Sequence, residues 1–115
     1  MTRNILDKRL KSLTSELAEM GSLVEKQIYD SIKALKNHDI ELSEIVIKND
    51  DKVDALNKRI EEKCLIYMAT QSPMASDLRK MFAASKIVTD LERIADYAVD
   101  ICKINKLPCG ASSEK

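Results

Sequence analysis

Apolar side chains recur every three or four residues along almost the whole chain, and this rhythm most constrains the fold. It runs from Ile5 to Lys106 and contains one glycine, Gly21, and one proline, Pro73. Apolar residues at this spacing line one face of an α-helix, whereas turns and strands draw on residues that are scarce here. The rhythm therefore predicts long amphipathic helices. Aromatic residues, which favour strands, make up only 3% of the chain.

The first helical segment is predicted over residues 5–37. Asn4 is its expected N-cap, and Asn37 with His38 closes it. His38 is the single histidine of the chain, and its place in a turn predicts a solvated side chain rather than a metal ligand. Gly21 costs the helix about 1 kcal/mol relative to alanine. It therefore indicates either a closely packed neighbour or simple tolerance.

Two further segments complete the helical pattern. Asp39 can cap a second helix over residues 40–70. The clearest boundary follows, because Ser72 is a favourable N-cap and Pro73 suits the first position of a helix. A third helix is therefore predicted over residues 73–106.

Three long helices with short connections leave few possible architectures. Each helix would be about 45 Å long, and short connections force neighbours to run antiparallel. We expect an all-α fold, an up-down-up three-helix bundle with long antiparallel helices, over residues 1–107, followed by a flexible tail at residues 108–115. One narrow core would leave broad helix faces for a fourth helix or a second copy.

Charge and hydropathy exclude several classes of function. Nineteen basic residues balance nineteen acidic ones without a basic block, so nucleic acid is not an expected partner. No signal-peptide core or run of about 18 apolar residues is present, so we expect a cytoplasmic protein without membrane insertion.

Cys64, Cys102 and Cys109 form no paired motif and are expected as reduced thiols. A disulfide between Cys64 and Cys102 would have to span about 33 Å.

The predicted hairpin of the second and third helices brings two pairs of acidic residues close together. Asp50 with Asp54, and Glu92 with Asp96, stand four residues apart and share a helix face. Such pairs are no more frequent than chance predicts, so only their position carries weight. Folding the second and third helices back about residues 71–72 places the two pairs within about one helical turn of each other.

Carboxylates gathered in this way are costly without compensation. Asp51 and Asp90 are further candidate members of the cluster. Oxygen ligands favour a hard cation such as Mg, Mn or oxidised Fe, and Zn also accepts carboxylates. The alternative is a solvated charged stripe in which Lys86 and Arg93 pair with the acids across the helices.

The third segment resembles the signature helix of the PhoU family of phosphate-uptake regulators. The similar stretches are SDLR at residues 76–79 and TDLERIADYAV at residues 89–99. LVEKQ at residues 23–27, IEEKC at residues 60–64 and QSP at residues 71–73 agree in register. Two positions depart from the family pattern, since Ala95 stands where glycine is usual and Tyr97 where histidine is usual.

The resemblance implies a non-enzymatic, all-helical protein that represses phosphate-uptake signalling. The implied partners are the ATPase of a phosphate ABC transporter and a sensor histidine kinase. Family members bind metal through paired acid-x-x-x-Asp motifs, which here fall on Asp50 and Asp54 and on Glu92 and Asp96. The implied cofactor is a divalent or trivalent ion, Fe, Zn, Mn or Mg. No catalytic residue is expected, and a carboxylate-bridged oxidase would need Glu-x-x-His pairs that the chain lacks.

Family members normally contain two tandem three-helix repeats, and this chain carries one. We therefore expect a homodimer that rebuilds the six-helix form. The cytoplasmic module of a sodium-phosphate cotransporter, a fragment of a longer chain and a purely structural dimerisation bundle remain alternatives.

Overall fold

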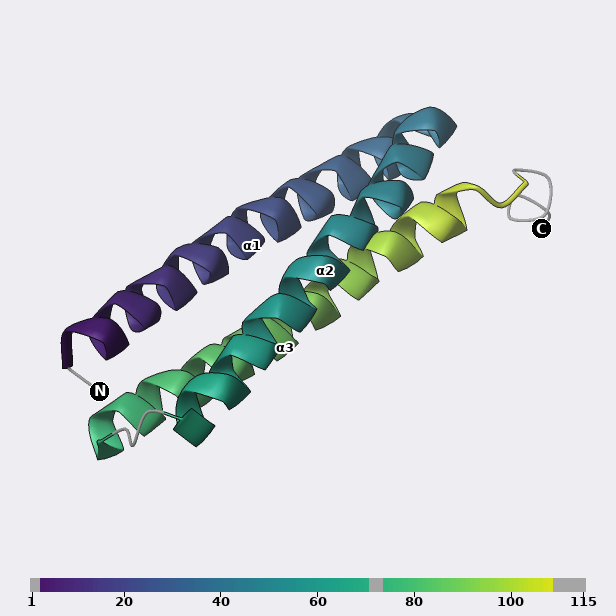
Figure 1. Ribbon diagram of the computed structural model, residues 1–115. Helices are drawn as coiled ribbons and strands as arrows, with labels where there is room; N and C mark the ends of the chain where they lie inside the picture. The colour runs from purple at the N-terminus through teal and green to yellow at the C-terminus, as the bar shows by residue number, and fades with distance from the viewer. Residues whose placement is uncertain (1–2, 71–73, 109–115) are drawn as a thin grey trace.

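Three long helices run up, down and up along one axis (Figure 1). The computed structural model describes residues 3–70 and 74–108, and this part of the chain contains no strand. The helices are α1 (Arg3–Asn37), α2 (Ile40–Thr70) and α3 (Ala75–Asn105). The predicted all-α bundle of three antiparallel helices is confirmed. The expected tail, apart from Pro108, lies outside the described residues.

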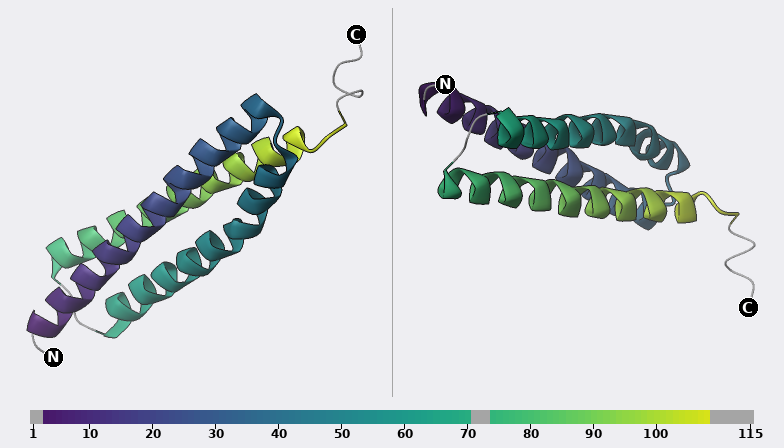
Figure 2. Two further views of the ribbon diagram at one scale, coloured as in Figure 1. Left: turned by 90° about the horizontal axis from the view of Figure 1, so that it is seen from above. Right: turned by 60° about the horizontal axis from the view of Figure 1, so that its bottom comes forward.

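The bundle is a rod of 64 × 20 × 16 Å in which every helix packs against the other two. The α1–α2 turn and the end of α3 lie together at one end of the rod, as Figure 2 shows. The start of α1 and the start of α3 lie at the other end. Residues far apart in sequence therefore meet at defined levels along the axis.

The core consists of two clusters of buried apolar side chains, each with residues from all three helices. Burying these side chains is the main favourable term that holds the helices together. The central cluster consists of Leu13, Met20, Val24, Val53, Leu56, Ile60, Cys64, Ala84, Val88 and Ala95. A second cluster of Leu6, Tyr67 and Met81 lies nearer the start of α1.

The buried face of α1 departs from the predicted apolar stripe towards the end of the helix. The rhythm predicts Ile32 and Leu35 in the core, but these side chains are 53% and 48% exposed. Gln27, Ser31 and Ala34 are buried in their place. The small side chains of Ser31 and Ala34 allow the helices to approach closely near the turn.

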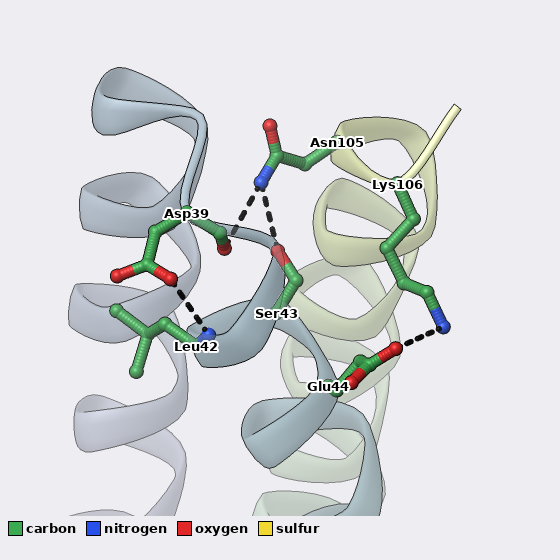
Figure 3. Close-up of polar contacts among 6 residues, drawn as sticks. All are labelled: Asp39, Leu42, Ser43, Glu44, Asn105 and Lys106. Atoms are coloured by element: carbon green, nitrogen blue, oxygen red, sulfur yellow. Dashed lines mark hydrogen bonds and ion pairs between the residues drawn. The ribbon is translucent and has the colours of Figure 1, made fainter. Parts of the chain in front are cut away.

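One buried amide explains why the helices must approach there. Asn105, which is 4% exposed, donates from Nδ2 to the carbonyl oxygen of Ala34 at 3.1 Å. The same nitrogen lies 3.4 Å from the carbonyl oxygen of Asp39 and 2.9 Å from the hydroxyl oxygen of Ser43 (Figure 3). Its Oδ1 accepts from Nδ1 of His38 at 3.2 Å. Asn105 thus ties the end of α3 to both sides of the α1–α2 turn.

The α1–α2 turn follows the sequence prediction closely. α1 ends at Asn37, and His38 has a positive φ of 52°, the left-handed conformation that commonly ends a helix. Asp39 caps α2, because its Oδ1 accepts a hydrogen bond from the backbone N–H of Leu42 at 3.0 Å (Figure 3). His38 is exposed as expected, although its contact with Asn105 was not foreseen.

The predicted N-cap of α1 is wrong, and α3 begins later than predicted. α1 begins at Arg3, so Asn4 lies inside its first turn. α3 begins at Ala75 rather than at Pro73, and the proposed cap Ser72 lies outside the described residues. The carboxylate of Asp77 accepts a hydrogen bond from the backbone N–H of Met74 at 3.0 Å. An acid in the first turn stabilises a helix at this position.

The register of the α2–α3 hairpin is the feature that positions the candidate site. The sequence predicts that Cys64 lies level with residue 80. In the structure the Cys64 sulfur lies 3.8 Å from the carbonyl oxygen of Met81. Cys64 and Cys102 are both buried and form no disulfide with each other, and Cys109 lies outside the described residues. The register predicted between α2 and α3 is therefore correct to within one residue at this level.

Candidate metal site between α2 and α3

Four carboxylates from the two predicted motifs lie within electrostatic range of one another where α2 and α3 pack together. Asp50 and Asp54 belong to α2, and Glu92 and Asp96 belong to α3. Asp96 is exposed, and the other three residues are half-buried. We call these four residues the acidic seam.

The four groups lie close enough to change each other's electrostatics. Burial raises the pKa of Asp50; the hydrogen bond from Gln27 opposes the rise, and the charges of Asp54 and Asp96 add to it. Burial also raises the pKa of Glu92, and the charges of Asp96, Asp54 and Asp50 raise it further. The structure therefore brings together the two pairs that the hairpin register predicts to be level.

The two additional candidates do not join this group equally. Asp90 pairs with Lys86 of its own helix at 3.4 Å. Asp51 is exposed, and its charge acts on its neighbour Asp50. Glu61, which was not predicted, adds to the raised pKa of Glu92.

The acidic seam lacks the counter-charges that a structural ion-pair network would have. Lys86 pairs within α3 and does not cross to α2. Within residues 3–70 and 74–108, no lysine or arginine forms an ion pair with any of the four carboxylates. The alternative in which Lys86 and Arg93 neutralise the seam is therefore not what the structure contains.

A third helix reaches the seam through Gln27. Its side chain is 5% exposed, and its Nε2 donates to Oδ1 of Asp50 at 3.1 Å. Its Oε1 is buried without a hydrogen-bond partner in the described part of the chain. Sequence reasoning gave Gln27 no role at the site. A polar residue one turn after the core residue Val24 was the available signal.

The chemistry of the acidic seam fits a hard, multivalent cation. Its ligands are oxygens only, they are partly removed from water, and their charges are uncompensated. In the described ranges, however, no three His, Cys, Asp or Glu side chains are placed so that they could hold one ion. Binding therefore requires the carboxylates to turn towards a common point, which half-buried and exposed side chains can do.

The two positions that depart from the family pattern lie in different environments. Ala95 is fully buried in the core, where a small residue is needed between the helices. Tyr97 is 58% exposed.

A search of the described helices for one long and apolar enough to cross a membrane finds none.

Comparison with known proteins identifies the family. A family profile described as "PhoU domain" matches residues 17–104. A PhoU homolog of Clostridium acetobutylicum, named a phosphate-specific transport system accessory protein, is 50% identical over 107 residues, covering 92% of this chain and 49% of the relative. Similar proteins of Rhizobium meliloti and Escherichia coli are 40% and 39% identical, covering 84% and 82% of this chain and 41% and 39% of the relatives.

The chain thus spans half or less of the length of these relatives. The profile match nevertheless covers parts of all three helices, since it begins within α1 and ends one residue before α3 does. On this evidence the chain belongs to the PhoU family.

Proposed function

We propose that this chain is a non-enzymatic regulatory module of a phosphate-specific transport system. The observation that carries the proposal is the 50% identity, over 92% of the chain, to a protein named as an accessory of that system. Its partners are the ATPase of a phosphate ABC transporter and a sensor histidine kinase, which it contacts in the cytoplasm. Repression of phosphate uptake when phosphate is plentiful is the proposed outcome.

The test is complementation of a bacterium from which the gene for its own PhoU protein has been deleted. Expression of this chain is expected to restore low phosphate uptake at high external phosphate. The control strain expresses the chain shortened before α3, which removes one third of the bundle. Uptake that stays as high as in the deletion strain, despite soluble expression of the chain, would contradict the proposal.

The acidic seam is proposed to bind a divalent or trivalent ion, Fe, Zn, Mn or Mg. Support comes from four neighbouring carboxylates with which no lysine or arginine of the described residues forms an ion pair. The binding energy offsets the mutual repulsion of the carboxylates and their partial loss of hydration. The ion would link α2 to α3 and stabilise the hairpin.

Elemental analysis of the purified protein tests this site. The quadruple variant Asp50→Asn, Asp54→Asn, Glu92→Gln, Asp96→Asn is expected to lose all retained metal. Asp90→Asn is the matched control, because Asp90 carries the same charge on α3 but pairs with Lys86. Equal metal content in the native and quadruple-variant proteins would reject the assignment.

A homodimer is the proposed assembly. The chain covers 49% of the length of the Clostridium relative, so two copies supply as many helices as one such protein would if its remaining half folds similarly. Exposed apolar side chains on α1 and α3 provide the surface for association.

A further inference from the structure

We propose that α3 pairs with α3 of a second copy in an antiparallel coiled coil, an inference that rests on the proposed homodimer. The observation behind it is a second stripe of mainly apolar residues along α3, which we call the outer stripe. Its members recur in alternating steps of three and four residues: Ile87, Asp90, Ile94, Tyr97, Ile101 and Ile104. This alternation is the repeat of a coiled-coil seam.

The outer stripe is not the stripe that α3 buries in its own bundle. The buried stripe lies one residue further on at each step and includes Val88, Ala95 and Cys102. One residue turns a helix by about 100°, so the two stripes occupy different faces. Tyr97 and Ile104 of the outer stripe are 58% and 60% exposed. A helix with a second apolar face is typically covered by another chain.

The two edges of the outer stripe differ in character. One edge carries Lys86, Arg93 and Asp100, which stand seven residues apart and are all exposed. The other edge carries Leu91 and Ala98, which pack within the bundle. Charges at the edge of a coiled-coil seam set the orientation of the partner helix. Only the edge with Lys86, Arg93 and Asp100 is free to do so here.

These edge charges match each other when the second α3 runs in the opposite direction. A two-fold axis perpendicular to the helices brings this edge of one copy against the same edge of the other. With the axis level with residue 92, Lys86 comes within one helical turn of Asp100 of the second copy. Arg93 comes within one turn of Asp90 of the second copy. Each contact occurs twice, because the axis repeats it.

A parallel pair of α3 helices lacks this complementarity. In a parallel coiled coil each residue of the seam lies beside its own copy. The two Asp90 carboxylates would then meet in one apolar seam, and burying like charges without a cation is costly. The antiparallel pair instead supplies Arg93 to each Asp90.

The apolar residues also find partners about the same axis. Ile87 lies level with Tyr97 of the second copy, and Ile101 lies level with Ala83. The pairing extends over residues 83–101 of both helices, a length of about 27 Å at 1.5 Å per residue. The layer of Asp90 and Ile94 is mixed, and a polar residue within a seam fixes the register of the two helices. A surface that complements itself in this way fits a second copy of the chain.

Charge reversal tests the pairing. The dissociation constant of the dimer is measured for the 115-residue protein by sedimentation equilibrium in buffer with EDTA, so that bound metal does not contribute. Lys86→Glu and Asp100→Lys should each weaken the dimer about 10-fold, because each places like charges at two symmetry-related contacts. The double variant Lys86→Glu, Asp100→Lys exchanges the charges and should return to within about threefold of the native value.

Two comparisons separate this contact from other effects. Lys86 also pairs with Asp90 of its own helix at 3.4 Å, but that pair is lost equally in Lys86→Glu and in the double variant. Restored dimerisation in the double variant therefore reports the contact between copies. Lys103→Glu is the matched control, since Lys103 is exposed on the side of α3 that carries Asp96. It should change the dissociation constant less than about twofold.

The outcomes distinguish the pairing from the dimer itself. A native dimer that neither reversal weakens, or a double variant as weak as the single variants, would overturn the antiparallel pairing while the homodimer stands. An equal loss for Lys103→Glu would assign the effect to overall charge and would also overturn the pairing. A native protein that is monomeric at 100 µM would overturn both proposals.

Discussion

Glu92 carries its charge at a cost to the folded state. Burial and the charges of Asp96 and Asp54 raise its pKa above the ordinary value of 4.5. An acid with a raised pKa binds its proton more tightly in the folded state than in the unfolded state. Its contribution to the free energy of unfolding is therefore most favourable below pH 4.5 and is lost as pH rises through the folded-state pKa. The metal-free protein is therefore strained electrostatically at neutral pH.

Replacement of this carboxylate gives a prediction with a defined sign. Glu92→Gln should raise the free energy of unfolding of the metal-free protein by about 0.5 kcal/mol at pH 7, the scale of one like-charge pair on a helix. The gain should shrink as pH falls below 4.5, because the native carboxyl then becomes increasingly protonated in both states. Urea denaturation at pH 7 and pH 4 measures both values. A variant that is less stable than the native protein at pH 7 would show that the repulsion is already compensated.

Asn105 makes the largest set of side-chain hydrogen bonds at the turn end of the rod. Asn105→Ala removes the contacts to Ala34, Asp39, Ser43 and His38 and leaves buried groups without partners. The expected loss is about 2 to 3 kcal/mol, since each orphaned buried group costs about 1 to 3 kcal/mol. Thermal unfolding followed by circular dichroism checks this value.

The adjacent residue supplies the control for that measurement. Lys106 forms an exposed ion pair with Glu44 at 3.5 Å (Figure 3). Exposed ion pairs contribute little, so Lys106→Ala should change stability by less than about 0.5 kcal/mol. Similar losses for the two variants would place the stabilisation in general packing of this end rather than in the Asn105 amide.

At the level of the helices, Gly21 is a position of tolerance rather than of close packing. Apart from the adjacent residues and the backbone of its own helix, a Cβ atom added there would meet no atom within 4 Å. Gly21→Ala should therefore stabilise the protein by about 1 kcal/mol, because alanine lowers the conformational entropy of the unfolded chain and favours the helix. A rise in the urea midpoint with an unchanged m-value is the expected result. A fall in the midpoint would mean that a neighbour, such as a second copy, occupies this surface.

The helices and their order followed from the sequence because the signals involved are local. The three-and-four spacing marks a helix wherever it occurs, and Asp39 caps α2 through its own neighbour Leu42. The start of α3 was misplaced because Ser72 and Pro73 are strong local signals, yet the described helix begins after Met74 with Asp77 in its first turn. Local rules do not decide whether Ser72 with Pro73 or the first-turn acid Asp77 marks the start of the helix.

The buried face of α1 could not be chosen from periodicity alone. After Val24, one stripe continues through Ile32 and Leu35, and another through Ser31 and Ala34. Both have helical spacing, and hydrophobicity favours the first. The structure takes the second, because the carbonyl oxygen of Ala34 must lie within hydrogen-bonding distance of α3. That requirement is tertiary and leaves no mark in the local pattern.

At the level of the whole molecule, the sequence predicts which residues of the candidate site share a level along the bundle axis. It does not predict which face of α1 turns towards them. A short connection fixes which residues of α2 and α3 lie level, so Asp50 and Asp54 could be matched with Glu92 and Asp96. The position of α1 around the axis depends on how the three helices wrap. For that reason the contribution of Gln27 emerged only from the structure.

The uncovered apolar surface of the rod predicts its assembly. Leu17 lines a groove of about 260 Å³ between α1 and α3, and Ile87 lines its other side. Leu35 lies five helical turns after Leu17, and Ile94 lies seven residues after Ile87, so both continue the same faces. Ile87, Ile94 and Leu35 are 47%, 39% and 48% exposed. Apolar surface extended along two neighbouring helices is typical of an interface.

The native protein should therefore elute as a dimer, with twice the chain mass of 13.0 kDa by light scattering after size-exclusion chromatography. The double variant Ile87→Lys, Ile94→Lys places two charges in the interface core and should shift the peak to a monomer, because burying unpaired charge is costly. Leu65→Lys is the control, since Leu65 is 67% exposed on α2 and lies outside this surface. A monomeric native protein at 100 µM would contradict the predicted dimer. A dimer that the double variant leaves intact but Leu65→Lys dissociates would show that the interface is not formed by α1 and α3.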